Sequence, residues 1–232
     1  MVQTMPPSPT LQDIFSTGQV QDSSGTKYPL EANIILPYTE ALYNAIRRYR
    51  PATVVEVGMA YGISSLSILA ALRETGGRLI SIDPNQDKTF HGIGVSNVER
   101  EGLADRHELI QQPDYFALPR LLESGLTIDF AYIDGWHTFD YTLLDFFYID
   151  KMVPKGGIVA FNDCGWRAIN KVLGFVRTHR QYKEINVGLA RNYDGDNIAK
   201  TLLKRATGRT NTDRYFQKLS TSEPNYDFYK FF

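Results

Sequence analysis

The chain has 232 residues, of which 43% are hydrophobic and 22% charged, and 25 basic residues nearly balance 26 acidic ones. This composition is ordinary for a folded globular protein and excludes a disordered or collagen-like chain. A net charge of −1 offers no overall field that would attract nucleic acid. No apolar run approaches the roughly 20 residues of a transmembrane helix.

The N-terminal region and the cysteine content indicate the cellular compartment of the protein. The opening sequence MVQTMPPSP has no basic patch followed by an apolar stretch, so we do not expect a secretory signal. The single cysteine, Cys164, excludes an intramolecular disulfide and suits a reducing environment. We therefore expect a cytoplasmic protein with no nucleic-acid or membrane partner.

Residues 1–50 are expected to form an N-terminal cap and a leading helix. They begin rich in Pro, Ser, Thr and Gln, continue as YPLEANIILPY, and lead into a helical segment. That helix should end before Pro51, because the residue that precedes a proline disfavours the helical conformation.

From residue 51 onward, short apolar segments alternate with segments of helical spacing. The apolar segments are 53–57, 78–82, 107–111, 128–133 and 157–161; the helical ones are 63–74, 94–103, 138–152 and 165–179. This alternation predicts an α/β fold with a doubly wound, mostly parallel sheet over residues 51–190. Ligands of such sheets bind at the carboxyl ends of the strands, so the residues after each apolar segment are the candidate site residues.

Residues 191–232 form a C-terminal extension that we expect to pack on the core or on a partner subunit. Between 200 and 218 there are six basic residues and one acid, Asp213. This stretch is interpreted as a solvated face or oligomer rim, with attraction of an anionic substrate as the alternative. The aromatic end, YDFYKFF, is too apolar to be free in solvent and is expected to pack as a strand or against a second subunit.

The segment VVEVGMAYGISS (54–65) predicts a ligand-binding loop. Gly58 and Gly62 flank a tight turn before a helix, where the backbone can approach a ligand and free N–H groups are available. The dinucleotide pattern G-x-G-x-x-G is not met, because Ala60 stands at the middle glycine. Glu56 would sit poorly beside a pyrophosphate and well beside a cation.

Asp83 follows the second apolar segment and could accept both hydroxyls of a ribose. Together with the glycine loop, it predicts a ligand with an adenosine-like sugar that need not carry phosphate. Two other functions are kept as alternatives: an NAD(P)-dependent oxidoreductase on a similar sheet, and a binding module without catalysis.

These motifs resemble those of a known family. VVEVGMAYGISSLSILAAL and GRLISID resemble the first two motifs of class I S-adenosylmethionine-dependent methyltransferases, in particular the small catechol O-methyltransferase-like and bacterial O-methyltransferases, and the similarity extends over about residues 35–185. The resemblance implies a Rossmann-like, seven-stranded sheet, S-adenosylmethionine as cofactor and O-methylation of a small hydroxylated acceptor. Because small relatives often pair, a homodimer is compatible with it. The implied cofactor contacts are Glu56, Gly58, Ala60, Tyr61, Gly62, Ser64, Asp83, Pro84, Asp114, Tyr115, Asp134 and Trp136.

The stretch AYIDGWHTFD (131–140) carries the implied catalytic residues. Catechol-type enzymes have Asp-His-Trp-Lys where this chain has Asp134, Gly135, Trp136 and His137. In the family the aspartate binds magnesium, the tryptophan packs beside the cofactor and the lysine removes the substrate proton. Asp134 and His137 are therefore the expected catalytic residues, since histidine accepts a proton near neutral pH. Another active-site contact or a structural hydrogen bond remains open for His137.

The stretch AFNDCGW (160–166) completes an implied metal site. The family places Asp-Asn there as magnesium ligands, whereas this chain has Asn162 and Asp163 in the reverse order. With Asp134 they would supply oxygen ligands for Mg²⁺ or another divalent cation. Loss of the metal is the alternative. Tyr28, Tyr38, His91 and Trp166 are expected as walls of the acceptor pocket.

Overall fold

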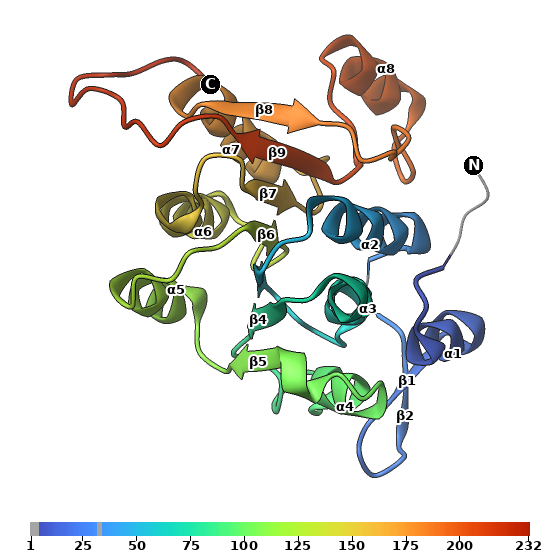
Figure 1. The fold of residues 1–232 in the computed structure, drawn as a ribbon. Coiled ribbons are helices and arrows are strands. Elements are labelled where there is room, and N and C mark those ends of the chain that lie inside the picture. The colour runs from blue at the N-terminus through green and yellow to red at the C-terminus, as the bar shows by residue number, and fades with distance from the viewer. Residues whose placement is uncertain (1–4, 32–33) are drawn as a thin grey trace.

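The computed structural model describes residues 5–31 and 34–232 (Figure 1). A seven-stranded sheet in the order β5-β4-β3-β6-β7-β9-β8 crosses the centre of the molecule. Its strands are β3 (Thr53–Val57), β4 (Arg78–Ile82), β5 (His107–Ile110), β6 (Phe130–Ile133), β7 (Ile158–Phe161), β8 (Tyr182–Ile185) and β9 (Arg214–Lys218). The helices are α1 (Pro9–Thr17), α2 (Leu36–Tyr49), α3 (Ile63–Thr75), α4 (Ile93–Arg100), α5 (Asp114–Glu123), α6 (Phe139–Met152), α7 (Arg167–His179) and α8 (Ile198–Ala206), with a 3₁₀ turn at Ala104–Arg106.

Five of the seven strands are parallel. In register, Val55 of β3 lies between Ile80 of β4 and Ala131 of β6, and β5 and β7 extend the parallel part on either side. β9 runs antiparallel to both β7 and β8. The five apolar segments therefore coincide with the parallel strands, and the predicted seven-stranded, mostly parallel α/β fold is confirmed.

Helices cover both faces of the sheet because alternate strand residues point to opposite sides. Val54 joins the buried cluster formed with α1, α2, α3 and α4, whereas Val55 joins the cluster formed with α5, α6 and α7. Each strand of the centre is thus buried on both faces, which explains its nearly continuous apolar sequence. On the helices, Leu66 belongs to the first cluster and Phe146 to the second, and both are fully buried.

The order of the strands creates the crevice in which a ligand can bind. β3 lies between β4, which follows it in sequence, and β6, which begins more than 70 residues later. The connections from β3 to β4 and from β6 to β7 therefore run to opposite sides of the sheet. In doubly wound sheets, the loops at the carboxyl ends of such a pair of strands diverge and leave a binding crevice.

The C-terminal extension completes the sheet and continues past it. β9 is inserted between β7 and β8, so this extension is part of the core. The aromatic end does not form the expected strand; it lies against α7, where the ring of Phe232 is 5.5 Å from that of Phe175 and 5.1 Å from that of His179. The backbone N–H of Lys230 donates to Nε2 of His179 at 3.2 Å. Phe232 thus packs within the same chain, whereas Tyr226, Tyr229 and Phe231 of this end stay exposed.

The N-terminal part lies beside α3 and α4 (Figure 1). α1 is followed by a hairpin of β1 (Gln19–Gln21) and β2 (Lys27–Pro29), and Leu11 and Ile14 of α1 are buried in the cluster that contains α3. Ser8 caps α1 and donates to Glu101 beyond α4 at 2.8 Å. None of the helices described in the structure is long and apolar enough to cross a membrane.

Candidate active site

A cavity of about 1260 Å³ opens at the carboxyl ends of the parallel strands. Every loop that follows one of the strands β3 to β7 contributes to its wall. The lining from these loops includes Gly58, Ala60, Tyr61, Asp83, Pro84, Asp114, Tyr115, Asp134, Trp136, His137, Asn162 and Asp163, together with Ser64 at the start of α3. Gly62 ends the loop in front of α3. Of the predicted cofactor, catalytic and metal residues, Glu56 and Gly62 do not line the cavity.

The loop after β3 has a backbone that other residue types cannot easily reproduce. Gly58 has φ of +88°, and a Cβ placed on it would lie 2.1 Å from the carbonyl oxygen of Asp134. Gly62, at φ +78°, is the N-cap of α3, and a Cβ there would lie 3.0 Å from the oxygen of Gly94. The loop is therefore held tightly between β6 and α4, and the N-terminus of α3 faces the cavity with free N–H groups.

Glu56 lies beneath this loop. Its carboxylate is fully buried and accepts hydrogen bonds from Ser64 at 2.9 Å, from Ser81 at 2.6 Å and from Ser65. Burial raises the pKa of Glu56 to about 7, although the three serine hydroxyls oppose the shift. Glu56 thus joins β3 to α3 and β4, and it supports the Gly58 loop from below.

Asp83 fixes the same loop from the side. Its Oδ2 accepts from the backbone N–H of Met59 at 3.1 Å and of Ala60 at 2.8 Å, and from the side chain of Gln86 at 3.1 Å. Within the described part of the chain, its Oδ1 accepts from a single donor, the backbone N–H of Asn85, at 2.8 Å. Because a carboxylate oxygen has two lone pairs, Oδ1 keeps the capacity to accept a hydroxyl of a ligand in the cavity.

Asp114 and Asp145 form a buried pair of carboxyl groups at one end of the cavity. Asp114 begins α5, and its Oδ1 accepts from the N–H of Tyr115 at 2.7 Å. Asp145 on α6 is 1% exposed and neither oxygen has a conventional donor. Burial and the adjacent Asp114 raise the pKa of Asp145 well above its usual value. The shift favours the protonated form of Asp145, because protonation relieves the repulsion between two neighbouring carboxylates.

His137 lies between two carboxylates. Its Nε2 is 3.3 Å from Oδ1 of Asp134 and 3.5 Å from Oδ2 of Asp163. Burial lowers the pKa of His137, but the two aspartates outweigh it and the net shift is upward. Burial raises the pKa of Asp134 to about 6. Among the described residues, buried Nε2 has no well-aligned hydrogen-bond partner.

Asn162 is held by a network that reaches from β9. Its amide Nδ2 donates to the hydroxyl of Tyr132 at 3.2 Å and to Oδ1 of Asp213 at 3.1 Å, while Tyr132 donates to Oδ2 of Asp213 at 2.9 Å. Because its nitrogen is used in this way, the amide oxygen is the atom of Asn162 that remains for the cavity. Asp163 follows with φ of +48°.

The oxygens of Asp134, Asn162 and Asp163 are of the chemical type that Mg²⁺ prefers. Among the described residues, no cluster of three His, Cys, Asp or Glu side chains suits a metal ion, so this candidate set depends on the amide oxygen of Asn162. Cys164 next to them is fully buried and donates to the carbonyl of Phe161, as expected of a core residue.

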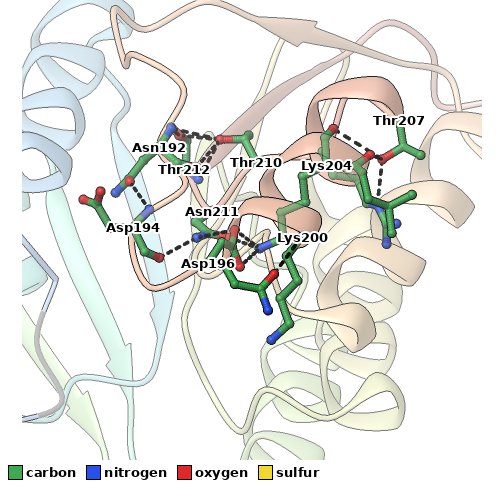
Figure 2. Close-up of polar contacts among 12 residues, drawn as sticks. Asn192, Asp194, Asp196, Lys200, Lys204, Thr207, Thr210, Asn211 and Thr212 are labelled. Carbon is green, nitrogen blue, oxygen red and sulfur yellow. Dashed lines mark hydrogen bonds and ion pairs between the residues drawn. The ribbon is translucent and has the colours of Figure 1, made fainter.

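The other half of the cavity is built from two segments outside the parallel sheet. Ile34, Ile35 and Tyr38 come from the start of α2, and Asn192, Asp194, Asp196, Lys204 and Asn211 come from the extension. Figure 2 shows the polar contacts that hold the extension in place: Lys204 pairs with Asp196 at 2.7 Å, and Asn211 donates to the carbonyl of Asp194 at 2.9 Å. The sequence analysis missed the lining residues of the extension, although NYDGDN (192–197) is a polar turn placed between two strands.

The four expected pocket walls divide into two pairs. Tyr38 and Trp166 line the cavity, and the ring of Trp166 lies 5.2 Å from that of His137. Tyr28 and His91 do not line it; their rings stack on one another at 4.4 Å. The segment after β4 contributes Phe90 instead of His91. The expectation for Tyr28 and His91 is therefore wrong: the two rings stack on each other outside the residues that line the cavity.

Comparisons with known proteins agree with this geometry. Residues 55–164 match a family model described as a methyltransferase domain. The chain is 30% identical over 116 residues to an Arabidopsis thaliana protein assigned as a caffeoyl-CoA O-methyltransferase, and 25% identical over 128 residues to caffeoyl-CoA O-methyltransferase 2 of Petunia hybrida. These matches cover 48% and 52% of this chain and 46% and 49% of the relatives. The chain thus spans about half the length of the curated relatives it matches.

Solved structures extend the likeness to the fold. An O-methyltransferase from Bacillus cereus in complex with SAH superimposes with a TM-score of 0.69 at 14% identity and covers 92% of both chains. The O-methyltransferase TomG from Streptomyces achromogenes, in complex with SAM, has a TM-score of 0.64 at 16% identity over 82% of both chains. The predicted resemblance is thereby confirmed to a methyltransferase domain over residues 55–164, and to the fold of solved O-methyltransferases over most of the chain.

Proposed function

We propose that the protein transfers a methyl group from S-adenosylmethionine to a hydroxyl of a small molecule. The observation that carries this proposal is the position of His137, which lies between two aspartates in the wall of the same cavity as the Gly58 loop. One half of the cavity thus has the features of a nucleoside site, and the other has a proton acceptor beside an open space.

The cofactor half is suited to a nucleoside that carries a cation. S-adenosylmethionine supplies a methyl group on a positively charged sulfur when it is bound. Oδ1 of Asp83 is placed to accept a ribose hydroxyl, and Asp114 is placed to accept from the amino group of an adenine. Asp134 adds negative charge at the carboxyl end of β6, and this charge attracts a cation into the crevice.

His137 is assigned as the general base. Its Nε2 has no aligned partner within the described structure, and Asp134 and Asp163 stabilise the imidazolium that forms when it accepts a proton. General-base catalysis of this kind typically contributes about 10²–10⁴-fold to the rate. Holding the acceptor oxygen in line with the methyl group contributes through orientation, up to about 7–11 kcal/mol.

We further propose a divalent cation, held by Asp134, Asn162 and Asp163. Such an ion would lower the pKa of an acceptor hydroxyl and fix its orientation. The support is the donor chemistry: two carboxylates beside His137 and an amide whose nitrogen is already engaged by Tyr132 and Asp213.

The test of the function has a binding part and a turnover part. S-adenosylhomocysteine should bind at micromolar concentrations in calorimetry and NADH should not; the opposite result would support an oxidoreductase and contradict the proposal. Radiolabelled methyl transfer from S-adenosylmethionine to a panel of phenols, catechols and sugars should then label at least one hydroxylated acceptor. Tight binding of S-adenosylhomocysteine with no labelled product from any acceptor would support a binding module without catalysis.

A further inference from the structure

A second cavity, of about 330 Å³, lies outside the candidate active site. It is lined by Asn170, Arg177, Thr207, Gly208, Arg209 and Arg214, and we refer to it as the arginine cavity. Three arginines are among the residues that line this space, and no acidic residue is. We propose that the arginine cavity is a binding site for a phosphate group.

Arg177 and Arg214 are held in place by a single acid. Arg214 makes two hydrogen bonds to Glu184, from Nε at 2.7 Å and from Nη2 at 2.6 Å. Arg177 contacts the same carboxylate at 3.3 Å, and its guanidinium lies 5.3 Å from the centre of the Phe216 ring. One carboxylate therefore serves two guanidiniums, so positive charge is left in excess between α7 and β9.

Arg209 adds a third positive charge. Its Nε donates to the hydroxyl of Thr207 at 3.0 Å, and within the described residues it has no ion pair. Thr207 in turn donates to the carbonyl of Leu203 at 2.8 Å, so the position of Arg209 is set by the end of α8 (Figure 2). Three arginines and one acid leave a local charge of +2 around the cavity.

Holding like charges this close together costs free energy, and the cost is visible at Arg177. Burial and the neighbouring Arg214 lower the pKa of Arg177. A bound anion removes that repulsion. Guanidinium groups bind phosphate oxygens through paired N–H donors, and groups already fixed by other contacts lose little further side-chain entropy on binding.

The volume of the cavity exceeds that of a single phosphate ion and admits part of the molecule that bears it. The phosphate could thus be free inorganic phosphate or the phosphoryl group of a metabolite. Either ligand would contact the loop 207–209, and two residues further on Asn211 lines the larger cavity and packs against Gly165. Anion binding is therefore expected to order the segment that forms the acceptor side of the active site.

The experiment compares two arginines that differ in their relation to the cavity. Arg209→Gln removes a charge from the wall, whereas Arg205→Gln removes a charge from the exposed face of α8, where Arg205 lies over the ring of Tyr193. Neither change breaks an ion pair of the described structure. Binding of inorganic phosphate and of glucose 6-phosphate is measured by calorimetry, and the melting temperature is measured in phosphate and in sodium chloride of equal ionic strength.

The wild-type protein should bind phosphate saturably and melt at a higher temperature in phosphate than in chloride. Arg209→Gln should weaken binding at least 10-fold and Arg205→Gln by less than 2-fold. Tighter binding of glucose 6-phosphate would identify a phosphorylated metabolite, and equal binding would identify the phosphate alone; both support the site. Absence of saturable binding, or equal losses in both variants, would overturn it. Unchanged affinity for S-adenosylhomocysteine in Arg209→Gln keeps this result separate from the proposed methyl transfer.

Discussion

Nε2 of His137 lies 3.3 Å from Oδ1 of Asp134, although the two residues are separated by a full turn at the end of β6. Gly135 lies within this turn, at a position where a Cβ would lie 3.0 Å from the side chain of Val57. The carboxylate holds the imidazole toward the cavity and favours its protonated form, so the pair can accept a proton from a hydroxyl that binds there.

Replacement of His137 by alanine should therefore reduce methyl transfer without affecting the cofactor site. We expect kcat to fall by about 10²–10⁴-fold, because a general base contributes about this factor. The dissociation constant of S-adenosylhomocysteine should stay within 2-fold. His91→Asn is a matched control, since His91 lies outside the cavity and asparagine tolerates its φ of +53°. Full activity in His137→Ala would exclude His137 as the base.

Removal of divalent cations tests the metal proposal. Activity should be lost in EDTA and restored by Mg²⁺, and Asp163→Ala should abolish the response to Mg²⁺ by removing one ligand. Asp194→Asn removes a carboxylate from the opposite wall of the cavity and should leave the Mg²⁺ response intact. Calorimetry with Mn²⁺ provides a readout that does not depend on turnover. Equal activity with and without EDTA would limit Asp134 and Asp163 to a role as polar lining.

The parallel part of the fold could be predicted because local sequence and tertiary burial agree there. The strand from Thr53 to Val57 has the range that its apolar pattern predicts, and the glycine after it ends the strand. β9 could not be recognised in the same way. Its sequence, RYFQK, has only two apolar residues, and these are flanked by Arg214 and Lys218, whose charges pair with the distant residues Glu184 and Asp150.

The candidate site was predictable only where it follows the strands. Gly58 and Asp134 come directly after β3 and β6, so sequence order places them at the same edge of the sheet. Asp194 and Asn211 reach the cavity through a loop whose course depends on contacts among its own polar side chains. Glu56 shows the opposite case: its place in the sequence beside the loop predicted a contact with the cofactor. Its carboxylate is instead buried and accepts hydrogen bonds from three serines of neighbouring elements.

The pKa of Glu56 makes stability depend on pH in a defined direction. A carboxyl group whose pKa rises from 4.5 in the unfolded chain to about 7 in the folded protein holds more protons when folded between these values. The free energy of unfolding should therefore fall as the pH rises from about 4.5 to about 7, by roughly 3 kcal/mol for this group.

Glu56→Gln should remove this part of the pH dependence, because the amide keeps contacts with the serines and does not titrate. Urea unfolding at pH 5 and pH 8 measures the difference between the two proteins. Glu108→Gln, at an exposed ion pair with Arg78, should follow the wild type. The same pH dependence in Glu56→Gln and wild type would show that the Glu56 carboxyl keeps the same pKa in the folded and unfolded states.

The raised pKa of Asp145 should make cofactor affinity depend on the proton of that carboxyl group. Asp145→Asn keeps a hydrogen-bond donor toward Asp114 and should bind S-adenosylhomocysteine within 3-fold of wild type near neutral pH, with less loss of affinity at high pH. Asp145→Ala removes that donor and should weaken binding at least 10-fold. Calorimetry from pH 6 to pH 9 measures both, with the exposed Asp105→Asn as control. Wild-type affinity in Asp145→Ala would contradict the role of the pair.

Alanine substitutions at two glycines distinguish the free-energy cost of backbone strain from that of a steric clash. Gly58 and Gly76 have φ values of +88° and +84°, a backbone conformation that strains alanine at both positions. At Gly76 a Cβ meets nothing within 4 Å, whereas at Gly58 it would lie 2.1 Å from the carbonyl oxygen of Asp134. That clash is with backbone of the neighbouring strand end and cannot be relieved by a side-chain movement.

Gly76→Ala should therefore lower the melting temperature by only a few degrees and keep the affinity for S-adenosylhomocysteine. Gly58→Ala should either fail to fold or push the loop and the end of β6 apart, which displaces Asp134 and reduces cofactor affinity at least 10-fold. Thermal melts and calorimetry on the two variants distinguish the two costs. Equal melting temperatures and equal affinities would show that the loop moves freely, and that close contact between Gly58 and Asp134 is not needed to shape the cavity.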